Sequence, residues 1–344
     1  MNNFAKLIVN WQKRAGRHGL PWQAADPYQI WLSEIMLQQT QVKTVIPYYE
    51  RFINTLPSIT ALAQAPEDEV MRLWSGLGYY ARARNLQRAA KQVLEQHEGN
   101  FPTEFESILA LPGVGRSTAA AISVFAFNRR HAILDGNVKR VLARHFGVDG
   151  DVKSKPVEAR LWQLAQRELP ATSLKAYTQG LMDMGAVICT SRSPQCAQCP
   201  VNATCVAFLE QRVDALPGKS ETRTIPRRKV KMLILTAKGN VLLEKRAARG
   251  IWGGLWSLPE APMAADVVQE AKQRWGMACR SASKLSMVKH AFTHYALTIY
   301  PYLLEVSRLR STTNNPALMW MALDQAHSVA LPAPVKKMLI GLRQ

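Results

Sequence analysis

The first 210 residues repeat apolar side chains every three or four positions, the spacing that places them on one face of a helix. This spacing predicts helices over residues 30–46, 67–74, 81–94, 117–127 and 138–146. Proline and glycine mark the expected breaks, at Pro47, Pro57, Pro66, Gly99, Pro112 and Gly147. Residues 1–210 are therefore predicted to form an all-α domain.

The pattern changes beyond residue 210. Residues 211–229 are polar, contain two prolines and have no periodicity, which predicts a linker. Two strand-like runs then flank Lys238-Gly239, a sequence that favours a hairpin turn. The expected strands cover 231–236, 240–246 and 296–306, and one helix is expected over 265–275. Residues 230–344 are therefore predicted to form a second, α+β domain.

The chain is strongly basic: among its 344 residues, 44 Lys and Arg stand against 25 Asp and Glu, a net charge of +19. Residues 226–344 alone hold 18 basic and 6 acidic side chains, a net charge of +12. A polyanion is an expected partner. The alternative is a basic protein whose net charge serves only to keep it soluble. No apolar run approaches the ~20 residues that span a bilayer, and the first residues do not form a signal peptide pattern. A cytoplasmic protein without membrane association is expected.

Four of the five cysteines lie close together, with the spacing C-x6-C-x2-C-x5-C, at Cys189, Cys196, Cys199 and Cys205. Four thiolates can complete a zinc site or hold the irons of a [4Fe-4S] cluster. Zinc ribbons usually pair two C-x2-C units across a longer gap, whereas these cysteines follow one another in one loop. The spacing therefore favours a [4Fe-4S] cluster over zinc, and Cys279 is expected to be a core thiol.

Residues 103–127 contain a second motif, two helices joined by the sequence LPGVG. Thr103 and Glu106 are predicted to form a capping box for the first helix. Gly113 and Gly115 permit close backbone approach, and the free N–H groups at the start of the second helix can hold a phosphate. This pattern is typical of a helix-hairpin-helix that grips the DNA backbone, and an ordinary turn between two helices is the alternative.

Two carboxylates differ in their sequence surroundings. Glu34 lies among apolar neighbours on a predicted helix, so burial is expected to raise its pKa and make it a general acid. Asp135 stands just before a helix and near Lys139 and Arg140, so its ionised form is expected to be favoured. Such a pair can cleave glycosidic bonds through an oxocarbenium-like state. The alternative for Glu34 is a buried ion-pair partner, and the alternative for Asp135 is a plain N-cap.

Residues 76–85, GLGYYARARN, place Tyr79 and Tyr80 beside Arg82 and Arg84. Aromatic side chains next to cations suit base stacking combined with phosphate pairing. Core tyrosines at the start of a helix are the alternative interpretation.

Six motifs occur in one order and at fixed separations: LPW at 20–22, SEIMLQQTQV, GLGYYARARN, LPGVGRSTA, ILDGNVKRVL and the four-cysteine loop. In this combination the chain closely resembles the MutY-type adenine DNA glycosylases. That family belongs to the helix-hairpin-helix glycosylase superfamily with endonuclease III and carries a MutT-like C-terminal domain. The resemblance covers essentially the whole chain.

The resemblance implies a role for each of several residues. Glu34 would donate a proton to adenine N7 and later help to activate water, and Asp135 would stabilise the oxocarbenium ion. Asn137 would position the catalytic carboxyls, while Gln39 and Tyr79 would enter the duplex when adenine is flipped out. Further DNA contacts are implied for Arg82, Gly113, Gly115, Ser117 and Lys139, and contact with the flipped base for Asp183. The four cysteines would hold a [4Fe-4S] cluster and present Arg192 to phosphates.

Two departures from related patterns matter. Relatives resembling endonuclease III carry a lysine after LPGVGR that forms a Schiff base with the sugar, whereas this chain has Ser117. Monofunctional hydrolysis is therefore expected. The loop of the family that reads 8-oxoguanine usually runs Phe-Ser-His, and here it is Phe292, Thr293 and His294.

The C-terminal domain lacks the dense glutamates that hold Mg²⁺ in Nudix enzymes, so lesion reading is expected of it rather than hydrolysis. The sequence thus predicts a monomeric adenine DNA glycosylase acting on duplex DNA with adenine opposite 8-oxoguanine or guanine. The alternatives are an endonuclease III-like glycosylase and lyase for oxidised pyrimidines, and a non-enzymatic iron-sulfur redox regulator that binds DNA.

Overall fold

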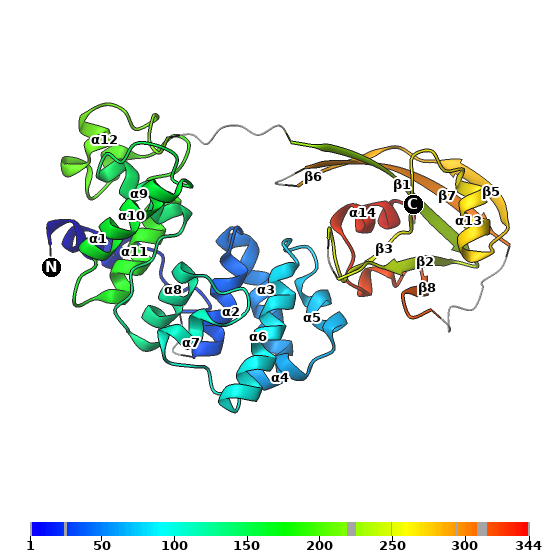
Figure 1. The fold of residues 1–344 in the computed structure, drawn as a ribbon, viewed down its shortest axis with the longest axis horizontal. Helices are drawn as coiled ribbons and strands as arrows, with labels where there is room; N and C mark the ends of the chain where they lie inside the picture. Colours follow the sequence, from blue (N-terminus) through cyan, green and yellow to red (C-terminus); the bar gives the residue numbers. More distant parts are fainter. Residues whose placement is uncertain are drawn as a thin grey trace. The chain divides into compact units, whose positions relative to one another are not determined.

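The computed structural model of the chain describes residues 2–23, 26–218, 225–248, 250–292, 295–307 and 315–342. These residues form two compact units (Figure 1): Met1–Gln64 with Asn85–Thr222, and Ala65–Arg84 with Arg223–Gln344. We call them the helical unit and the sheet unit. The sequence pattern alone grouped Ala65–Arg84 with the helices before it, but this segment packs with the C-terminal strands.

The helical unit contains α1 (Asn3–Ala15), α2 (Pro27–Leu37), α3 (Val42–Thr55), α4 (Ile59–Gln64), most of α6 (Ala81–His97), α7 (Phe105–Leu109), α8 (Arg116–Phe127), α9 (Gly136–His145), α10 (Lys155–Glu168), α11 (Leu174–Val187) and α12 (Val206–Leu209). Two short 3-10 helices, η1 (Cys196–Gln198) and η2 (Asn202–Thr204), lie within the cysteine loop. The predicted all-α character of this part of the chain is confirmed.

The structure corrects one predicted helix. Residues 30–46 form not one helix but parts of α2 and α3, because the backbone turns at Gln39, whose φ of 56° lies in the left-handed region. Pro47 was expected to end a helix and instead lies inside α3. Burial of Val45, Tyr49 and Phe52 on the same helix outweighs the backbone hydrogen bond that the proline removes.

The predicted capping box at Thr103 and Glu106 is also wrong. The N-cap of α7 is Glu104, and no side-chain hydrogen bond caps this described helix end. The helix has five residues and begins one residue later than the capping box requires. Its position is set by burial of Ile108 rather than by a cap.

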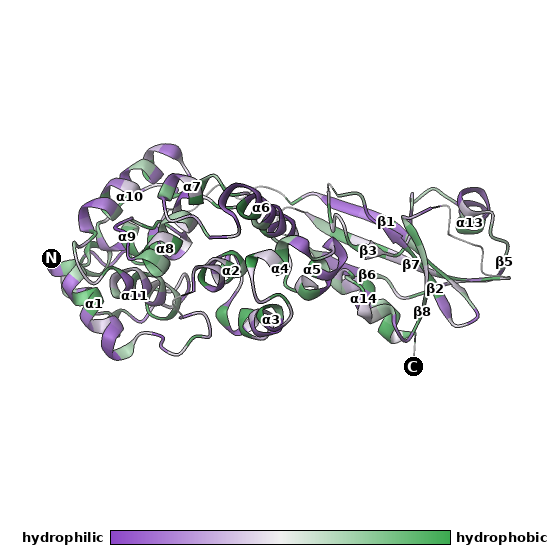
Figure 2. Cartoon of the chain, turned by 90° about the horizontal axis from the view of Figure 1, so that it is seen from below, coloured by the Kyte–Doolittle hydropathy of each residue, from purple (hydrophilic) through white to green (hydrophobic). Residues whose placement is uncertain are grey.

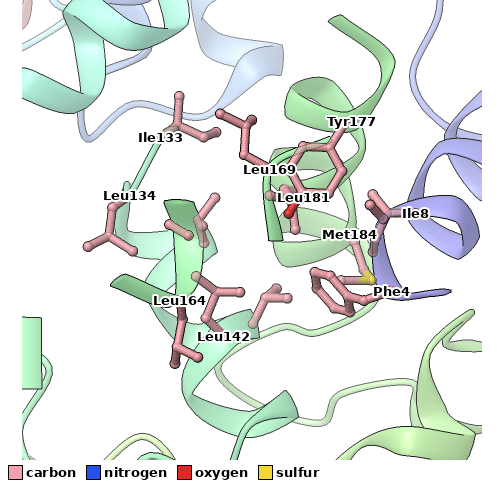
Figure 3. Close-up of a cluster of buried hydrophobic side chains, with 14 of the residues drawn as sticks. Phe4, Ile8, Ile133, Leu134, Leu142, Leu164, Leu169, Tyr177, Leu181 and Met184 are labelled. Atoms are coloured by element: carbon pink, nitrogen blue, oxygen red, sulfur yellow. The ribbon is translucent and has the colours of Figure 1, made fainter. Parts of the chain in front are cut away.

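The core of the helical unit collects side chains from both ends of its sequence (Figure 3). Phe4 and Ile8 of α1 lie against Tyr177, Leu181 and Met184 of α11 and against residues from α9 and α10. The exposed fractions of Phe4, Ile8 and Met184 are 6%, 0% and 0%. Helix α1 is thereby fixed to α11, which matters for the site described below.

The sheet unit contains α5 (Glu67–Trp74), β1 (Arg227–Ala237), β2 (Asn240–Lys245), β3 (Trp256–Ser257), β4 (Glu260–Ala261), α13 (Val267–Trp275), β5 (Cys279–Lys284), β6 (Val288–Ala291), β7 (Ala296–Val306), β8 (Leu318–Ala322), the 3-10 helix η3 (Ala326–Ser328) and α14 (Ala333–Gly341). Its eight-stranded sheet runs β3-β2-β1-β7-β5, with β4 on β1, β6 on β7 and β8 on β2. Strands β1 and β7 are parallel, and the remaining pairs are antiparallel. The α+β prediction is confirmed.

The β1–β2 hairpin confirms the turn predicted at Lys238-Gly239. Both residues have positive φ, 47° and 73°, which is the requirement of a type I′ turn. The predicted linker extends too far, because β1 begins at Arg227, where it pairs with Ala296 of β7. Pairing with β7 thus extends the strand into a polar stretch that the sequence pattern assigned to a linker.

Hydropathy is mixed along the helices, and α10 carries both hydrophilic and hydrophobic residues, as a helix with one face on a core should (Figure 2). Within the described ranges, no helix combines the length and the apolar character that crossing a membrane requires.

Candidate active site

A pocket of about 520 Å³ opens in the helical unit and brings together side chains that are far apart in sequence. Its volume lies in the range of small-molecule and cofactor sites. Both carboxylates singled out in the sequence, Glu34 and Asp135, line it together with Asn137. The other lining residues are Arg17, Leu20, Trp22, Ile30, Ser33, Leu37, Thr40, Gln41, Val42, Lys43, Phe125, Gln179, Met182, Ala186 and Val187.

Glu34 is presented by α2, which starts at a well-formed N-terminus. Asp26 caps the helix by accepting from the backbone N–H of Gln29 at 3.0 Å, and Pro27 occupies the first helical position. Burial, followed by the nearby charge of Asp135, raises the pKa of Glu34 from 4.5 to about 8. The expected neutral carboxylic acid is therefore available at this position near pH 7.

Asp135 is the N-cap of α9, and it also lines the pocket. Its Oδ1 accepts from the backbone N–H of Val138 at 2.7 Å, and its Oδ2 accepts from Asn137 Nδ2 at 3.4 Å. Both interpretations of this residue are thus compatible, since the cap fixes the carboxylate in the pocket wall.

The expected lowering of the Asp135 pKa is wrong in its direction. Burial raises the pKa, while hydrogen bonds from the Val138 and Asn137 backbone and the charge of Arg140 oppose that rise. Lys139 does not contribute as expected, because its ammonium pairs with Glu158 Oε1 at 2.6 Å. The groups that favour the ionised form of Asp135 are present, but burial outweighs them.

Arg140 is a residue that the sequence did not single out as part of the site. Its Nη2 donates to Asn137 Oδ1 at 2.8 Å and to the Gly185 carbonyl at 2.6 Å, and its Nε donates to the Cys189 carbonyl at 2.7 Å. A Cβ atom on Gly185 would lie 2.6 Å from Asn137 Cβ, so α11 and α9 meet at this point only because residue 185 is a glycine. Asn137 is therefore held from two sides.

Asp183 was expected to contact a flipped base, but it is not among the described residues that line the pocket. It is fully buried, and its carboxylate accepts from the Arg17 backbone N–H at 2.8 Å, from Arg17 Nη2 at 2.6 Å and from Gln179 Nε2 at 2.7 Å. Arg17 and Gln179 do line the pocket. Asp183 thus positions two polar side chains there that the sequence analysis missed. Arg17 could not be found from local spacing, because Asp183 is 166 residues away in the sequence.

The helix-hairpin-helix turn adopts the predicted backbone. Gly113 has φ 82°, and a Cβ on it would lie 2.9 Å from Asn85 Cβ. Gly115 is the N-cap of α8, no side chain in the described part caps that end, and a Cβ there would meet nothing within 4 Å. The helix N-terminus is therefore open to an anion. Ser117 instead accepts from the Leu134 backbone N–H at 2.9 Å through its Oγ.

Gln39 and Tyr79 both occupy turns with positive φ, 56° and 49°, and are exposed.

Arg82 differs from the expectation of a DNA contact: it is only 9% exposed and donates to the Gly78 carbonyl at 3.1 Å. Its guanidinium also lies 5.4 Å from the Tyr79 ring centroid. Burial lowers the pKa of Arg82 to about 10. Arg82 therefore supports the turn that carries Tyr79.

The four clustered cysteines line one small cavity together with Arg144. Arg144 Nη1 lies 3.4 Å from Cys189 Sγ and donates to the Thr190 carbonyl at 2.7 Å, so a cation stands beside the sulfurs. Four thiolates around one zinc would lie about 4 Å apart. Within the described residues, no group of three or more His, Cys, Asp or Glu is arranged to hold a single metal ion.

In the sheet unit, Phe292 stacks on Tyr295 with ring centroids 4.4 Å apart, whereas Thr293 and His294 lie outside the described residues. Three acidic residues of this unit, Glu244, Glu260 and Glu270, are ion-paired. Arg246 bridges to Glu260, and Arg274 pairs with Glu244 at 2.9 Å and with Glu270 at 3.6 Å.

Residues 32–167 match the HhH-GPD superfamily of base excision DNA repair proteins, and residues 230–340 match the NUDIX domain. The chain is 38% identical over 343 residues to the adenine DNA glycosylase of Buchnera aphidicola subsp. Baizongia pistaciae, covering 99% of this chain and 97% of that protein. It is 32% identical over 397 residues to the adenine DNA glycosylase of Mus musculus, covering 97% of this chain and 76% of that protein.

Among solved structures, a thermostable thymine-DNA glycosylase matches with a TM-score of 0.55 and 30% identity, covering 60% of this chain and 95% of that chain. The resemblance to MutY-type enzymes is thus confirmed, and the lyase and redox-regulator alternatives are set aside. The chain belongs to the adenine DNA glycosylase family and is a base excision repair enzyme.

Proposed function

We propose that this enzyme removes adenine mispaired with 8-oxoguanine or guanine in duplex DNA, by flipping the base out and hydrolysing its N-glycosidic bond. The observation that carries the proposal is the pair of carboxyls in one pocket, with Glu34 neutral because burial raises its pKa to about 8. A neutral carboxylic acid beside a second, hydrogen-bonded carboxylate fits acid-assisted cleavage of a glycosidic bond.

The first step is departure of the base. Glu34 gives its proton to adenine N7, the bond between sugar C1′ and N9 breaks, and the bonding electrons leave with the base. Positive charge then develops on the sugar, beside Asp135. That charge favours the ionised form of Asp135, which the Val138 N–H and Arg140 already support.

The second step is addition of water. The Glu34 carboxylate accepts a proton as the water oxygen bonds to C1′, which restores the acid and leaves a free adenine and an abasic sugar. Asn137 keeps the Asp135 side chain in place through the contact to its Oδ2.

Base selection falls to the polar side chains that Asp183 orients. Arg17 and Gln179 offer donors and an acceptor to the edge of a base in the pocket. Because Asp183 is fully buried and bonded to both, each side chain has a fixed starting position before DNA binds.

The mechanism needs no Schiff base. Ser117 has no amine, and its hydroxyl is engaged by Leu134. Among the described lining residues the one lysine is Lys43. Borohydride should therefore trap no covalent complex between the wild-type enzyme and a duplex from which adenine has been removed. A trapped complex that Lys43→Ala abolishes would show lyase chemistry.

The cysteine loop is proposed to hold a [4Fe-4S] cluster through Cys189, Cys196, Cys199 and Cys205. Their shared cavity and the adjacent Arg144 guanidinium fit a bound anionic group. Bound there, the cluster would supply a rigid cross-link for residues 189–205.

The proposal is tested with duplexes that carry adenine opposite 8-oxoguanine, guanine or thymine, and one that carries thymine glycol. We expect adenine release in single-turnover assays to be fastest opposite 8-oxoguanine, slower opposite guanine and negligible opposite thymine. Equal rates for the three adenine duplexes, or strand cleavage at thymine glycol, would overturn the proposed substrate.

A further inference from the structure

The turn that presents Tyr79 is held by its own neighbours in the sheet unit. Gly76, Gly78 and Tyr79 all have positive φ, at 102°, 79° and 49°. Trp74 Nε1 donates to the Gly78 carbonyl at 3.2 Å, and the Gly76 N–H donates to the Tyr80 hydroxyl at 3.1 Å. Backbone in this region persists where the surroundings determine it fully, and such positions gather at functional sites. The 41% exposed Tyr79 side chain is therefore carried by a fixed backbone.

The segment before this turn is fastened to the C-terminal part of the sheet unit. Asp68 on α5 pairs with Lys245 Nζ on β2 at 2.6 Å, and Ser75 Oγ donates to the Leu331 carbonyl at 3.2 Å. These contacts join residues 177 and 256 positions apart in the sequence.

The segment after the turn is fastened to the loop between β2 and β3. Arg84 Nη1 donates to the Gly253 carbonyl. A Cβ on the next residue, Gly254, would lie 3.3 Å from Glu67 Oε1 and 3.7 Å from Arg84 Nη1. The loop therefore lies in contact with residues on both sides of the turn, and a side chain at Gly254 would require the Glu67 carboxylate to move by a few tenths of an ångström.

The same loop contacts the end of β6, which leads into the segment that was expected to read the lesion. Trp252, which is buried and has φ 55°, lies with its ring centroid 5.3 Å from that of Phe292 and 5.7 Å from that of His290. Phe292 directly precedes the Thr293-His294 pair in sequence. Trp252 and Gly253 are adjacent, so one loop contacts Phe292 through one residue and Arg84 through the next.

We infer that the Trp252-Gly253 segment couples Phe292, directly after the end of β6, to the turn that carries Tyr79, with Arg84 and Trp252 as positioning residues. When the base opposite adenine binds beside Phe292, the contacts of Trp252, Gly253 and Arg84 would change the position of the Tyr79 side chain. The inference rests on the proposed lesion-reading function and adds the residues that connect the two reading elements.

Selectivity is the first test. Arg84→Met removes the hydrogen bond to Gly253 but keeps a side chain of similar length, and Arg84→Lys restores a donor. Arg88→Met is the matched control, because Arg88 is exposed on the same helix and its loss removes the same charge. We expect Arg84→Met to reduce the ratio of single-turnover rates for adenine opposite 8-oxoguanine and opposite guanine by about tenfold. The ratio should be restored at least in part in Arg84→Lys and unchanged in Arg88→Met.

The inference is overturned if Arg84→Met slows both duplexes equally, or if its ratio matches that of the wild-type enzyme. Melting temperatures of the variants separate loss of folding from loss of coupling. If Arg84→Met does not fold, Trp252→Phe, which changes the contact to Phe292, takes its place with the same expected direction.

A second measurement is independent of the substrate. In the full-length protein without DNA, Trp252→Phe, which leaves Arg84 untouched, should accelerate amide hydrogen exchange in residues 76–84. Unchanged exchange there would show that the loop does not brace the turn. If the wild-type enzyme has no preference for 8-oxoguanine, the proposed substrate fails, and the exchange measurement still decides whether the two elements are connected.

Discussion

The Arg140 guanidinium donates from Nη2 to Asn137 Oδ1 at 2.8 Å, and both residues lie on α9. The same guanidinium donates from Nε to the Cys189 carbonyl at 2.7 Å. Asn137 in turn contacts Asp135, the residue beside which positive charge develops. A continuous set of hydrogen bonds therefore runs from the first cysteine of the loop to a catalytic carboxylate.

Loss of this connection should slow chemistry more than binding. Arg140→Met removes all of these donors, so Asn137 loses its fixed position beside Asp135, and we expect the single-turnover excision rate to fall on the order of 10²-fold. Lys139→Met is the control on the same helix, since it removes an equal charge that pairs with Glu158. DNA affinity should change equally in both variants, while only Arg140→Met should lose excision rate. An equal loss of excision rate in the two variants would contradict the role of Arg140.

The pH dependence of excision should follow Glu34. The residue must carry a proton to act as the acid, and its pKa in the free enzyme is raised to about 8. We expect kcat/KM to be independent of pH just below that value and to fall as pH rises through about 8. A profile that keeps rising to pH 9 would exclude Glu34 as the proton donor.

Glu34 should also make stability depend on pH. Between its ordinary pKa of 4.5 and about 8, the unfolded chain releases a proton that the folded chain retains, so stability is full below pH 4.5 and is lost as pH rises towards 8. Glu34→Gln removes this dependence. Its melting temperature should be close to that of the wild-type enzyme near pH 5 and clearly higher than it at pH 8. A variant that melts lower at both pH values would contradict burial of a neutral acid.

The metal content of the purified enzyme tests the cysteine loop. Four iron and about four sulfide ions per chain, with a yellow-brown colour, are expected for a [4Fe-4S] cluster. Cys199→Ser should lose this colour, while Cys279→Ser, outside the loop, should keep it. Colourless active protein with one zinc ion per chain would contradict the assignment.

The local parts of this structure could be predicted from the sequence. The hairpin at Lys238-Gly239 follows from turn chemistry, and the raised pKa of Glu34 follows from the apolar residues one helical turn away. Both depend on residues close in the chain, where spacing and backbone preference determine the outcome.

The remaining features depend on partners that periodicity does not specify. Arg82 and Asp183 look like contacts for DNA and base, but each is used internally, Arg82 by the Gly78 carbonyl and Asp183 by Arg17. The attachment of α5 to β2 through Asp68 and Lys245 likewise joins distant residues. Burial that results from tertiary packing also explains why the pKa of Asp135 is raised although cations flank it in sequence.

The role of Glu34 as the acid can be measured by following free adenine released from a duplex that carries adenine opposite 8-oxoguanine, with the wild-type enzyme and Glu34→Gln at saturating concentration. We expect one adenine per duplex from the wild-type enzyme. We also expect a rate at least ~10²-fold lower for Glu34→Gln, whose dissociation constant for the duplex should be unchanged. Release of adenine by Glu34→Gln at the wild-type rate would exclude Glu34 as the proton donor.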